Sequence, residues 1–365
     1  QRSRILKSAS LQEKNDNIIF QDIEEIYSRN IDWEQFREST ILITGPNGML
    51  ASYVMYMLIY LNEEKGMGIK IIAMARSKER FTNRFRMYSD REYITLITDS
   101  ILEPIHIDGK IDYIIHAASL ASPQYYDVCP VDVLSPNVIG TYNLLNLAVK
   151  KKIKGFLLFS TGDVYGVVNG IDYVTEQDLG IIDPLEIHSC YSESKRMAET
   201  LCNSFMHQYR VPVKILRIWH TYAPTMNIDK DPRVFASFMK NILNGQDIEI
   251  KSDGSGKRTF CYIADAIAGL FIIFTRGGCG EAYNICNTDQ FVSIRDLAVS
   301  LSALRQDVDI QVVWKQRPAD EHYTENTAIG QIAPSNEKLK KLGWEAKYDI
   351  QTGFGRVLSY LMENG

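Results

Sequence analysis

The sequence predicts an α/β fold in which a doubly wound parallel sheet, covered by helices on both faces, is joined to a smaller second domain. Short apolar runs rich in Ile, Leu and Val alternate with helical segments from residue 40 to residue 219. A glycine-containing turn connects the first of these runs to the first helix. Runs that are apolar at nearly every position, rather than at alternate positions, are typical of parallel strands buried on both faces.

The alternating region predicts six strands and the helices that connect them. The strands are expected at residues 40–45, 69–75, 93–99, 111–118, 155–160 and 213–219. The helices are expected at residues 49–62, 136–151 and 192–209. Six such units in this order match a Rossmann-type dinucleotide-binding fold.

The flanking segments predict an N-terminal extension. Residues 1–38 are polar at first and then carry apolar residues at helical spacing. We expect a helical arm that packs on the main fold, with an oligomeric or regulatory role as the alternative.

The chain after residue 219 predicts a second domain that is discontinuous in sequence. The Rossmann-type domain is expected to comprise residues 39–219 and 259–290, and the smaller α/β substrate-binding domain residues 220–258 and 291–365. Shorter elements are expected within these parts: helices at 234–245 and 259–276, and strands at 247–252 and 309–314.

The composition excludes several classes of protein. The 365 residues are 45% hydrophobic and 23% charged, as in an ordinary globular chain, and the net charge of −5 gives no electrostatic footprint for nucleic acid. No apolar run is long enough to cross a bilayer, and the first residues lack the apolar core of a signal peptide. Six scattered cysteines without a Cys-x-x-Cys pair predict reduced thiols, no metal site and a cytoplasmic location.

A phosphate-binding turn is predicted where the first strand meets the first helix, in the segment TGPNGMLA that begins at Thr44. Gly45 and Gly48 allow the backbone to approach a pyrophosphate, and the N-terminus of the following helix faces its charge. Ala51 permits close packing of that helix on the sheet. Because the pattern stands between a strand and a helix at the start of the fold, it predicts a nicotinamide dinucleotide cofactor.

The end of the second strand leaves the choice between NAD and NADP open. The acid that would hold the ribose hydroxyls is missing there, and Arg76 stands in its place, where it could meet a 2′-phosphate, stack on adenine or face solvent. Asp99, after the third strand, is placed to meet the adenine edge. The expected cofactor is NAD, with NADP as the alternative, and the expected contacts are Gly45, Asn47, Gly48, Met49, Arg76, Asp99, Ser100, Ala117, Ala118, Tyr191 and Lys195.

Two further motifs predict the oxidation of a hydroxyl group. Thr161 follows the fifth strand, and Tyr191 and Lys195 lie on one face of a helix at positions i and i+4. We expect the lysine charge to lower the tyrosine pKa, so that the phenolate takes the hydroxyl proton as hydride leaves. Thr161 is expected to hydrogen-bond the same hydroxyl.

A resemblance to a known family is carried by these motifs and by the segments HAASLASP, NVIGTYNLL, STGDVYG, YSESK, GSGKRTFCYIAD, RPAD and KLGWEA. They resemble the extended short-chain dehydrogenase/reductases that act on nucleotide sugars as epimerases, dehydratases or decarboxylases. The resemblance covers about residues 39–355. Three segments, HAASLASPQYY, CYSESKRMAET and DPRVFASF, are most similar to the UDP-glucuronate decarboxylase (UDP-xylose synthase) subgroup.

The resemblance implies roles for individual residues. The catalytic residues it implies are Thr161, Asp163, Tyr191 and Lys195. The substrate-binding residues it implies are Ser122, His220, Arg233, Arg258 and Arg317. Arg258 and Arg317 are expected to bind the diphosphate, because a guanidinium group makes paired contacts with phosphate oxygens.

Asp163 bears on the choice among the family's reactions. The resemblance implies Glu at this position in dehydratases and decarboxylases, and an additional Asp before it in dTDP-glucose dehydratases, whereas this chain has Gly162 and Asp163. A 4,6-dehydratase needs both a base at C5 and an acid at C6, but a β-keto acid loses CO₂ without a C5 base. The prediction is a UDP-glucuronate-type decarboxylase; a 4-epimerase and then a 4,6-dehydratase are the alternatives.

Other departures and partners complete the expectations. His220 stands where the family usually has Asn, and Thr225 replaces a family Arg, so a variant sugar or nucleotide is an alternative substrate. A non-catalytic dinucleotide sensor is the alternative of another class. The expected partners are a nucleotide-sugar substrate and a second copy of the chain, with neither nucleic acid nor membrane. The apolar residues that fit either pairing or packing on the chain's own sheet are Leu144, Leu145, Leu147, Met197, Leu201 and Phe205.

Overall fold

A seven-stranded sheet lies at the centre of the computed structural model, which describes residues 17–315 and 332–364. The strand order is β12-β7-β5-β4-β1-β2-β3, and all neighbouring strands are parallel. The strands are β1 (Thr40–Thr44), β2 (Lys70–Met74), β3 (Ile94–Ile97), β4 (Tyr113–His116), β5 (Gly155–Thr161), β7 (Val213–Ile218) and β12 (Ala282–Ile285). The predicted Rossmann-type sheet is confirmed, and its strand order reverses between β1 and β4.

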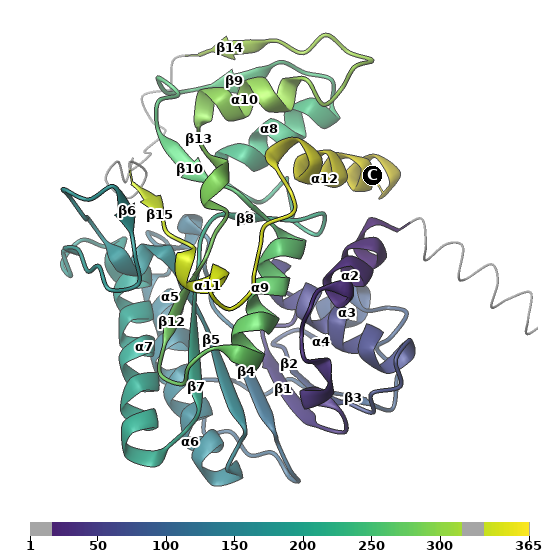
Figure 1. Ribbon diagram of the computed structural model, residues 1–365, viewed down its shortest axis with the longest axis vertical. Coiled ribbons are helices and arrows are strands. Elements are labelled where there is room, and N and C mark those ends of the chain that lie inside the picture. The colour runs from purple at the N-terminus through teal and green to yellow at the C-terminus, as the bar shows by residue number, and fades with distance from the viewer. Residues whose placement is uncertain (1–16, 316–331, 365) are drawn as a thin grey trace, which may run out of the picture.

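Helices cover both faces of this sheet (Figure 1). On one face lie α3 (Met49–Glu63) and α9 (Ile263–Arg276), and on the other α6 (Thr141–Lys151) and α7 (Ser189–Tyr209). Successive residues of β1 point to opposite faces, since Ile43 belongs to the first apolar core and Leu42 to the second. Each strand is therefore apolar at nearly every position.

The structure differs from the sequence prediction in several elements. A seventh strand, β12, and a short helix, α4 (Lys78–Arg84), were not predicted. Residues 259–262 are not helical: β10 (Lys257–Thr259) pairs with β13 (Phe291–Ser293), and β11 (Cys261–Tyr262) precedes α9. Pairing with strands distant in sequence overrides the local apolar pattern there.

A second group of elements lies above the sheet in Figure 1. Two parallel strands, β9 and β14, pack with three helices there, and β10 and β13 form a separate antiparallel pair. The strands and helices that pack together are α8 (Val234–Leu243), β9 (Ile248–Ile250), α10 (Ile294–Ser302), β14 (Val312–Trp314) and α12 (Ile350–Asn364). The predicted boundaries between the two domains stay a prediction.

Short elements complete the described part of the chain. They are η1 (Trp33–Phe36), η2 (Pro123–Tyr125), α5 (Pro130–Ser135), the π-helical η3 (Pro136–Gly140), η4 (Gly162–Tyr165), β6 (Tyr173–Val174), β8 (Thr221–Tyr222), η5 (Thr288–Gln290), β15 (Ala333–Pro334) and α11 (Glu337–Lys340). Among the described helices, none combines the length and the apolar character that crossing a bilayer requires.

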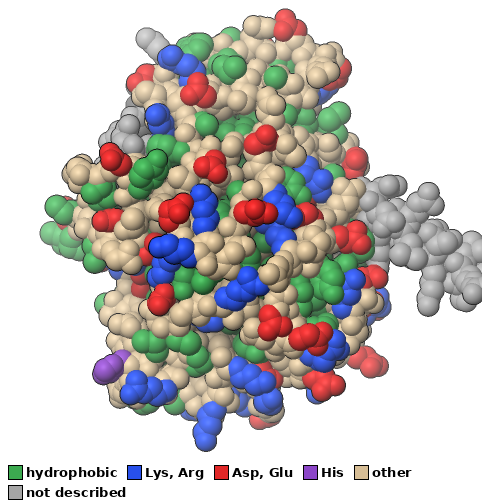
Figure 2. Space-filling view, in the orientation of Figure 1, with side chains coloured by type: hydrophobic (Ala, Val, Ile, Leu, Met, Phe, Trp, Pro, Cys, Tyr) green, Lys and Arg blue, Asp and Glu red, His purple; other side chains and the backbone are tan. Residues whose placement is uncertain are grey.

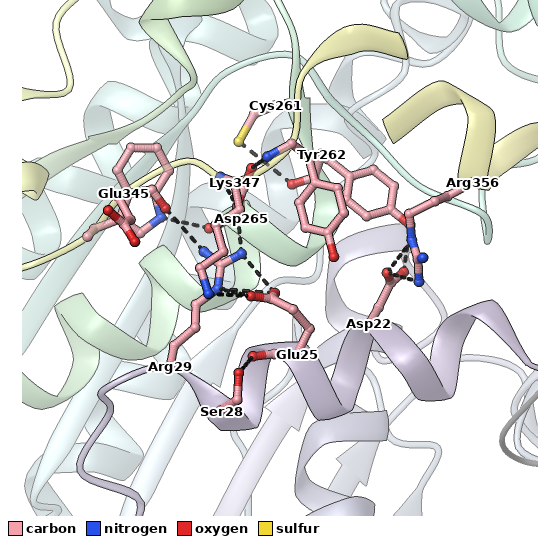
Figure 3. Close-up of polar contacts among 12 residues, drawn as sticks. Asp22, Glu25, Ser28, Arg29, Cys261, Tyr262, Asp265, Glu345, Lys347 and Arg356 are labelled. Atoms are coloured by element: carbon pink, nitrogen blue, oxygen red, sulfur yellow. Dashed lines mark hydrogen bonds and ion pairs between the residues drawn. The ribbon is translucent and has the colours of Figure 1, made fainter. Parts of the chain in front are cut away.

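The N-terminal helix α2 (Ile18–Ser28) is bonded to the rest of the fold by two buried acids (Figure 3). Asp22 accepts hydrogen bonds from the hydroxyls of Tyr53 on α3 at 2.9 Å and Tyr262 at 2.7 Å, and Arg356 of α12 forms an ion pair with it at 2.8 Å. Burial raises the pKa of Asp22, while the Arg356 charge and the hydroxyl hydrogen bonds lower it. One carboxylate thus joins α2 to α3 and α12.

The second acid belongs to α9. Asp265 is fully buried and forms an ion pair with Arg29 at 2.6 Å, and Arg29 also pairs with Glu25 at 2.8 Å. The carboxylate of Asp265 further accepts the backbone N–H groups of Lys347 and Tyr348. The segment that follows residue 16 is therefore an integral part of the packing.

We expect the substitution Asp22→Ala to lower the free energy of unfolding by about 3–5 kcal/mol, because it leaves Arg356 and two tyrosine hydroxyls without their partner. Urea unfolding of the wild-type and variant proteins measures this difference. Glu34→Ala, which removes an exposed ion pair with Arg37, is the control and should leave the midpoint unchanged. An unchanged midpoint for Asp22→Ala would contradict the role assigned to α2.

Candidate active site

The glycine turn lies where the strand order reverses, directly after β1. Gly45 has φ +67°, a conformation that disfavours other residues, and a Cβ built on it would lie 2.8 Å from the Cα of Ala118. Gly48 is the N-cap of α3, and its N–H donates to the carbonyl of Gly45 at 3.0 Å. The side-chain oxygen of Asn47 is buried and has no hydrogen-bond partner among residues 17–315 and 332–364. The turn thus offers a close backbone approach, a helix N-terminus and a free acceptor.

A buried histidine fixes the turn to the end of β4. The Thr44 hydroxyl accepts the N–H groups of Ala117 and Ala118 at 3.2 and 3.1 Å and lies 2.9 Å from Nδ1 of His116. Nε2 of His116 lies 3.0 Å from the Thr141 hydroxyl. Burial lowers the pKa of His116 to about 3, so the imidazole is neutral. This contact was not predicted; the signal for it was a histidine at the end of an otherwise apolar strand.

Three of the predicted cofactor contacts, two of them expected at the adenosine, lie along the same sheet edge. The N–H of Gly45 donates to the carbonyl of Met74, and that of Ala75 to the carbonyl of Ile97, so the ends of β1, β2 and β3 are aligned. The three side chains are exposed there: Arg76, Asp99 and Ser100. This arrangement places them beside the glycine turn. It agrees equally with the three roles predicted for Arg76, which are contact with a 2′-phosphate, stacking on adenine and exposure to solvent.

The predicted catalytic residues come from β5 and α7. Thr161 ends β5, and its hydroxyl accepts the N–H of Asp163 at 3.2 Å. Tyr191 lies in the first turn of α7, with its ring stacked on that of Tyr126 at a centroid distance of 5.4 Å. Lys195 is buried, and its Nζ lies 5.8 Å from the centre of the Tyr191 ring. The structure therefore brings all four predicted catalytic residues together.

The electrostatics of the tyrosine differ from the prediction. Burial and the charge of Asp163 raise the pKa of Tyr191, although a hydrogen bond with Thr161 and the charge of Arg233 act in the opposite direction. The expected lowering by Lys195 is wrong for this arrangement, because burial lowers the pKa of Lys195 itself to about 7 and its Nζ donates to the carbonyl of Phe159 at 2.7 Å. The Tyr191 hydroxyl is consequently protonated near neutral pH.

Asp163, the predicted catalytic acid, interacts electrostatically with a cation from the second group of elements. Burial raises the pKa of Asp163, and the Thr161 hydrogen bond and the charge of Arg258 lower it. Arg258 lies on β10, whereas Asp163 follows β5. The site is thus assembled from both parts of the chain.

His220 is close enough to two of the predicted substrate-binding arginines for their charges to act on it. Burial lowers its pKa to about 3, and the charges of Arg258 and Arg233 act in the same direction, so the imidazole is neutral. Its Nδ1 is buried and lacks a hydrogen-bond partner among the residues described. The guanidinium of Arg233 is already paired with Asp231 at 2.5 Å, which leaves Arg258 as the more available cation.

Other polar atoms point to a ligand in the same region. The hydroxyl oxygens of Ser119, Ser122 and Thr225 are buried without hydrogen-bond partners in the described part of the chain. Buried polar groups are normally paired, so atoms of this kind mark positions where a ligand or water completes the bonding. Ser119 and Thr225 were not among the predicted site residues. Arg317 lies outside the described residues. Within the described ranges, no group of three or more His, Cys, Asp or Glu side chains could hold a metal ion.

Comparison with known proteins identifies the family. The model of the NAD dependent epimerase/dehydratase family matches residues 41–286. The chain belongs to this family. Curated relatives include UDP-glucuronic acid decarboxylases 6 and 3 of Arabidopsis thaliana, each 32% identical over 314 residues that cover 86% of both chains. UDP-glucuronic acid decarboxylase 1 of Danio rerio is 30% identical over 326 residues, 88% of this chain and 72% of the relative.

Solved structures of the same fold include epimerases and a dehydratase. A UDP-glucose 4-epimerase of Thermotoga maritima has a TM-score of 0.74 at 22% identity, covering 89% of this chain and 99% of its own. A UDP-glucuronic acid 4-epimerase of Bacillus cereus, solved with UDP-glucuronic acid and NAD, has a TM-score of 0.71 at 21% identity and covers 89% and 100%. A dTDP-glucose 4,6-dehydratase of Bacillus anthracis, solved with NAD, has a TM-score of 0.68 at 22% identity and covers 89% and 97%. These likenesses support the fold.

The buried lysine of this family member predicts a pH dependence of stability. Lys195 keeps its proton up to its ordinary pKa of 10.5 in the unfolded chain but loses it at about 7 in the folded protein. The unfolded state therefore binds more protons between these values, and the free energy of unfolding rises with pH across that window. Unfolding of the nucleotide-free protein at several pH values, beside Lys195→Met, measures this rise. Parallel curves for the two proteins would contradict it.

Proposed function

We propose that the protein is an NAD-dependent UDP-glucuronate decarboxylase. The observation that carries this proposal is a single acid after β5: Asp163 follows a glycine, Gly162, and not a second acid. This set suits an acidic sugar that loses CO₂, and it lacks the adjacent acid pair that dehydration of a neutral sugar uses. The curated relatives named above, which are UDP-glucuronic acid decarboxylases, support the same reaction.

The glycine turn supports NAD as the cofactor. Gly45, Gly48 and the N-terminus of α3 would hold the pyrophosphate, and the free acceptor of Asn47 would lie beside it. The backbone near Met49, Ala117 and Ala118 would complete this wall, with Arg76, Asp99 and Ser100 at the adenosine end of the site. When bound, NAD takes up a hydride from C4 of the sugar and can return it.

The catalytic residues would move a proton at the C4 hydroxyl. Tyr191, as the phenolate, would accept that proton while the Thr161 hydroxyl holds the same oxygen atom of the sugar. The Tyr191 hydroxyl is protonated in the structure, so this step needs added positive charge near the ring. Lys195 would supply part of that charge once its Nζ is protonated, and the nicotinamide ring of bound NAD⁺ would supply the rest. The stacked ring of Tyr126 fixes the orientation of Tyr191.

Decarboxylation would follow from the chemistry of the 4-keto sugar. The C6 carboxylate is then β to a ketone, so the C5–C6 bond can break with its electron pair passing toward the C4 oxygen. C5 then takes up a proton, and reduction of C4 completes the cycle. Asp163 would orient the sugar or assist the protonation of C5.

The charged and neutral donors near Asp163 would bind the rest of the substrate. Arg258 and Arg317 would hold the diphosphate, and Arg233 would line the same pocket. His220, as a neutral imidazole, and Ser122 would donate single hydrogen bonds. Selection of the glucuronate sugar and the uracil base by these residues is part of the proposal.

The direct test is incubation with UDP-glucuronate and NAD⁺, followed by mass spectrometry and NMR of the product. We expect a UDP-pentose and released CO₂. An unchanged mass with a new sugar configuration would identify a 4-epimerase instead. Nucleotide binding without turnover of any UDP-, dTDP-, GDP- or CDP-sugar would favour the non-catalytic sensor.

We also propose that two copies of the chain pair through the face formed by α5, η3, α6 and α7. Exposed apolar side chains on these elements support this: Val131, Ile139, Tyr142, Met197 and Tyr209. Of the residues named from the sequence, Leu144, Leu145, Leu147 and Phe205 are buried in the chain's own core, whereas Met197 is 47% exposed. Light scattering should report a dimer, and a monomer at micromolar concentration would contradict this proposal.

A cytoplasmic location stays a prediction of the proposal. All six cysteines are unpaired in the structure, which agrees with a reducing compartment. Cell fractionation with an antibody tests it, and recovery in a membrane-enclosed secretory fraction would contradict it.

A further inference from the structure

The backbone between the two catalytic residues of β5 and η4 lies directly against a tryptophan. A Cβ built on Gly162 would lie 2.7 Å from Cδ2 and 2.8 Å from Cε2 of the Trp219 indole. These distances are shorter than any contact a real side chain makes, so one of the two groups would have to move. Gly162 separates Thr161 from Asp163, and both neighbours act on Tyr191. The indole therefore occupies the place of a side chain at position 162, in the buried interior beneath the surface that Figure 2 draws.

The indole is held firmly in that place. Its Nε1 donates to the side-chain oxygen of Asn284 at 3.0 Å, and the hydroxyl of Tyr165 donates to the same oxygen at 2.7 Å. The Tyr165 ring is stacked on the indole at a centroid distance of 5.7 Å. Asn284 is fully buried on β12, and its amide nitrogen donates to the carbonyl of Ser335 at 3.0 Å. Trp219 cannot turn aside without breaking these contacts.

We propose that Trp219 selects the reaction that follows C4 oxidation: its indole fills the space beside Gly162, keeps a second acid from standing next to Asp163, and so favours loss of CO₂ over loss of water. This inference rests on the proposed function. It assigns a role to a residue that touches neither of the bonds that break. Trp219 acts through the space it takes from position 162, as a specificity-determining residue.

The two reactions differ in the groups they need. Loss of water from a 4-keto hexose breaks the C5–H and C6–O bonds, so one group takes the C5 proton and a second gives a proton to the departing hydroxyl. Loss of CO₂ from a 4-keto uronate breaks the C5–C6 bond, leaves its electron pair on the C4–C5 enolate and ends with one proton delivered to C5. A site in which no acidic side chain fits at position 162 therefore lacks the second group that loss of water needs. It can still support loss of CO₂.

A size exchange tests the contact. Gly162→Ala should lower kcat/KM for UDP-glucuronate by about a hundredfold, the effect of displacing catalytic groups by roughly an ångström. Trp219→Leu, which removes the ring atoms that the new Cβ would meet, should recover at least about tenfold of that loss in the double variant. Trp344→Leu shortens another buried tryptophan, whose Nε1 donates to the backbone carbonyl of Asp265, and should recover nothing. A double variant whose loss equals the product of the two single losses would overturn the inference.

Thermal unfolding midpoints of the same single and double variants provide a second double-mutant cycle, which needs no substrate. If Gly162→Ala does not fold, restored folding in the double variant with Trp219→Leu, but not with Trp344→Leu, is the equivalent rescue. Midpoints that fall additively would overturn the contact between the two residues.

The selectivity itself is tested with an added acid. Gly162→Asp combined with Trp219→Leu should convert UDP-glucose into a product that has lost water at least about tenfold faster than Gly162→Asp alone. Equal rates would overturn the proposed selection. Failure of the proposed function looks different, because the wild-type enzyme would then release no CO₂ from UDP-glucuronate.

Discussion

The substitution Tyr191→Phe is expected to lower kcat on UDP-glucuronate by about 10²–10⁴-fold, the range in which a positioned acid–base group acts. It removes only the phenolic oxygen that, in the proposed mechanism, takes the proton of the C4 hydroxyl. The ring itself is retained, and with it the stacking on Tyr126, so folding and nucleotide binding should be preserved. Steady-state rates and a binding isotherm for NAD on the same preparation separate these effects.

Tyr126→Phe is the matched control for this prediction. It removes a hydroxyl from the neighbouring ring, where the group donates to the carbonyl of Ala121 at 3.2 Å. The stacked pair stays aromatic in both variants. Full turnover by Tyr191→Phe, or an equal loss in both variants, would contradict the proton-transfer role of Tyr191.

The substitution Gly45→Ala is expected to weaken NAD binding by at least about tenfold. A non-glycine residue at φ +67° costs roughly 1–3 kcal/mol in backbone strain. The new Cβ would also lie 2.8 Å from the Cα of Ala118, so the turn and the end of β4 must separate. Isothermal titration with NAD measures the loss.

Gly66→Ala distinguishes the effect of backbone strain alone from the loss of the phosphate-binding turn. Gly66 also has a positive φ, +59°, but a Cβ there would meet no atom within 4 Å. It should lower stability slightly and leave NAD affinity unchanged. Equal NAD affinity for Gly45→Ala and the wild-type protein would contradict the assignment of the turn.

The elements that the sequence predicted well share a local signal. Strands such as β1 and β5 are buried on both faces, so nearly every residue is apolar and the run stands out against its polar neighbours. β12 has four residues and includes Asn284, whose side chain is bonded to distant segments. No local pattern could reveal it. The same holds for residues 259–262, which are strands because of partners elsewhere in the chain.

The candidate site likewise has features that the sequence predicted and features that it did not. Motif spacing brought Thr161, Tyr191 and Lys195 together correctly, since strand ends and helix faces follow from the fold. The direction of the Tyr191 pKa shift was not predicted correctly, because the pKa values of Tyr191 and Lys195 depend on burial more than on the distance between the two side chains. The contact between Gly162 and Trp219 is a packing relation between two strand ends, and spacing along the chain does not encode it.

The reaction in D₂O with UDP-glucuronate tests the central claim most directly, because it follows C4 and C5 separately. Loss of CO₂ from a 4-keto sugar delivers one solvent hydrogen to C5, whereas the hydrogen at C4 is the one first removed. NMR of the product should therefore show a UDP-pentose with one deuterium at C5 and none at C4. Deuterium at C4, or a product that retains C6, would contradict the account.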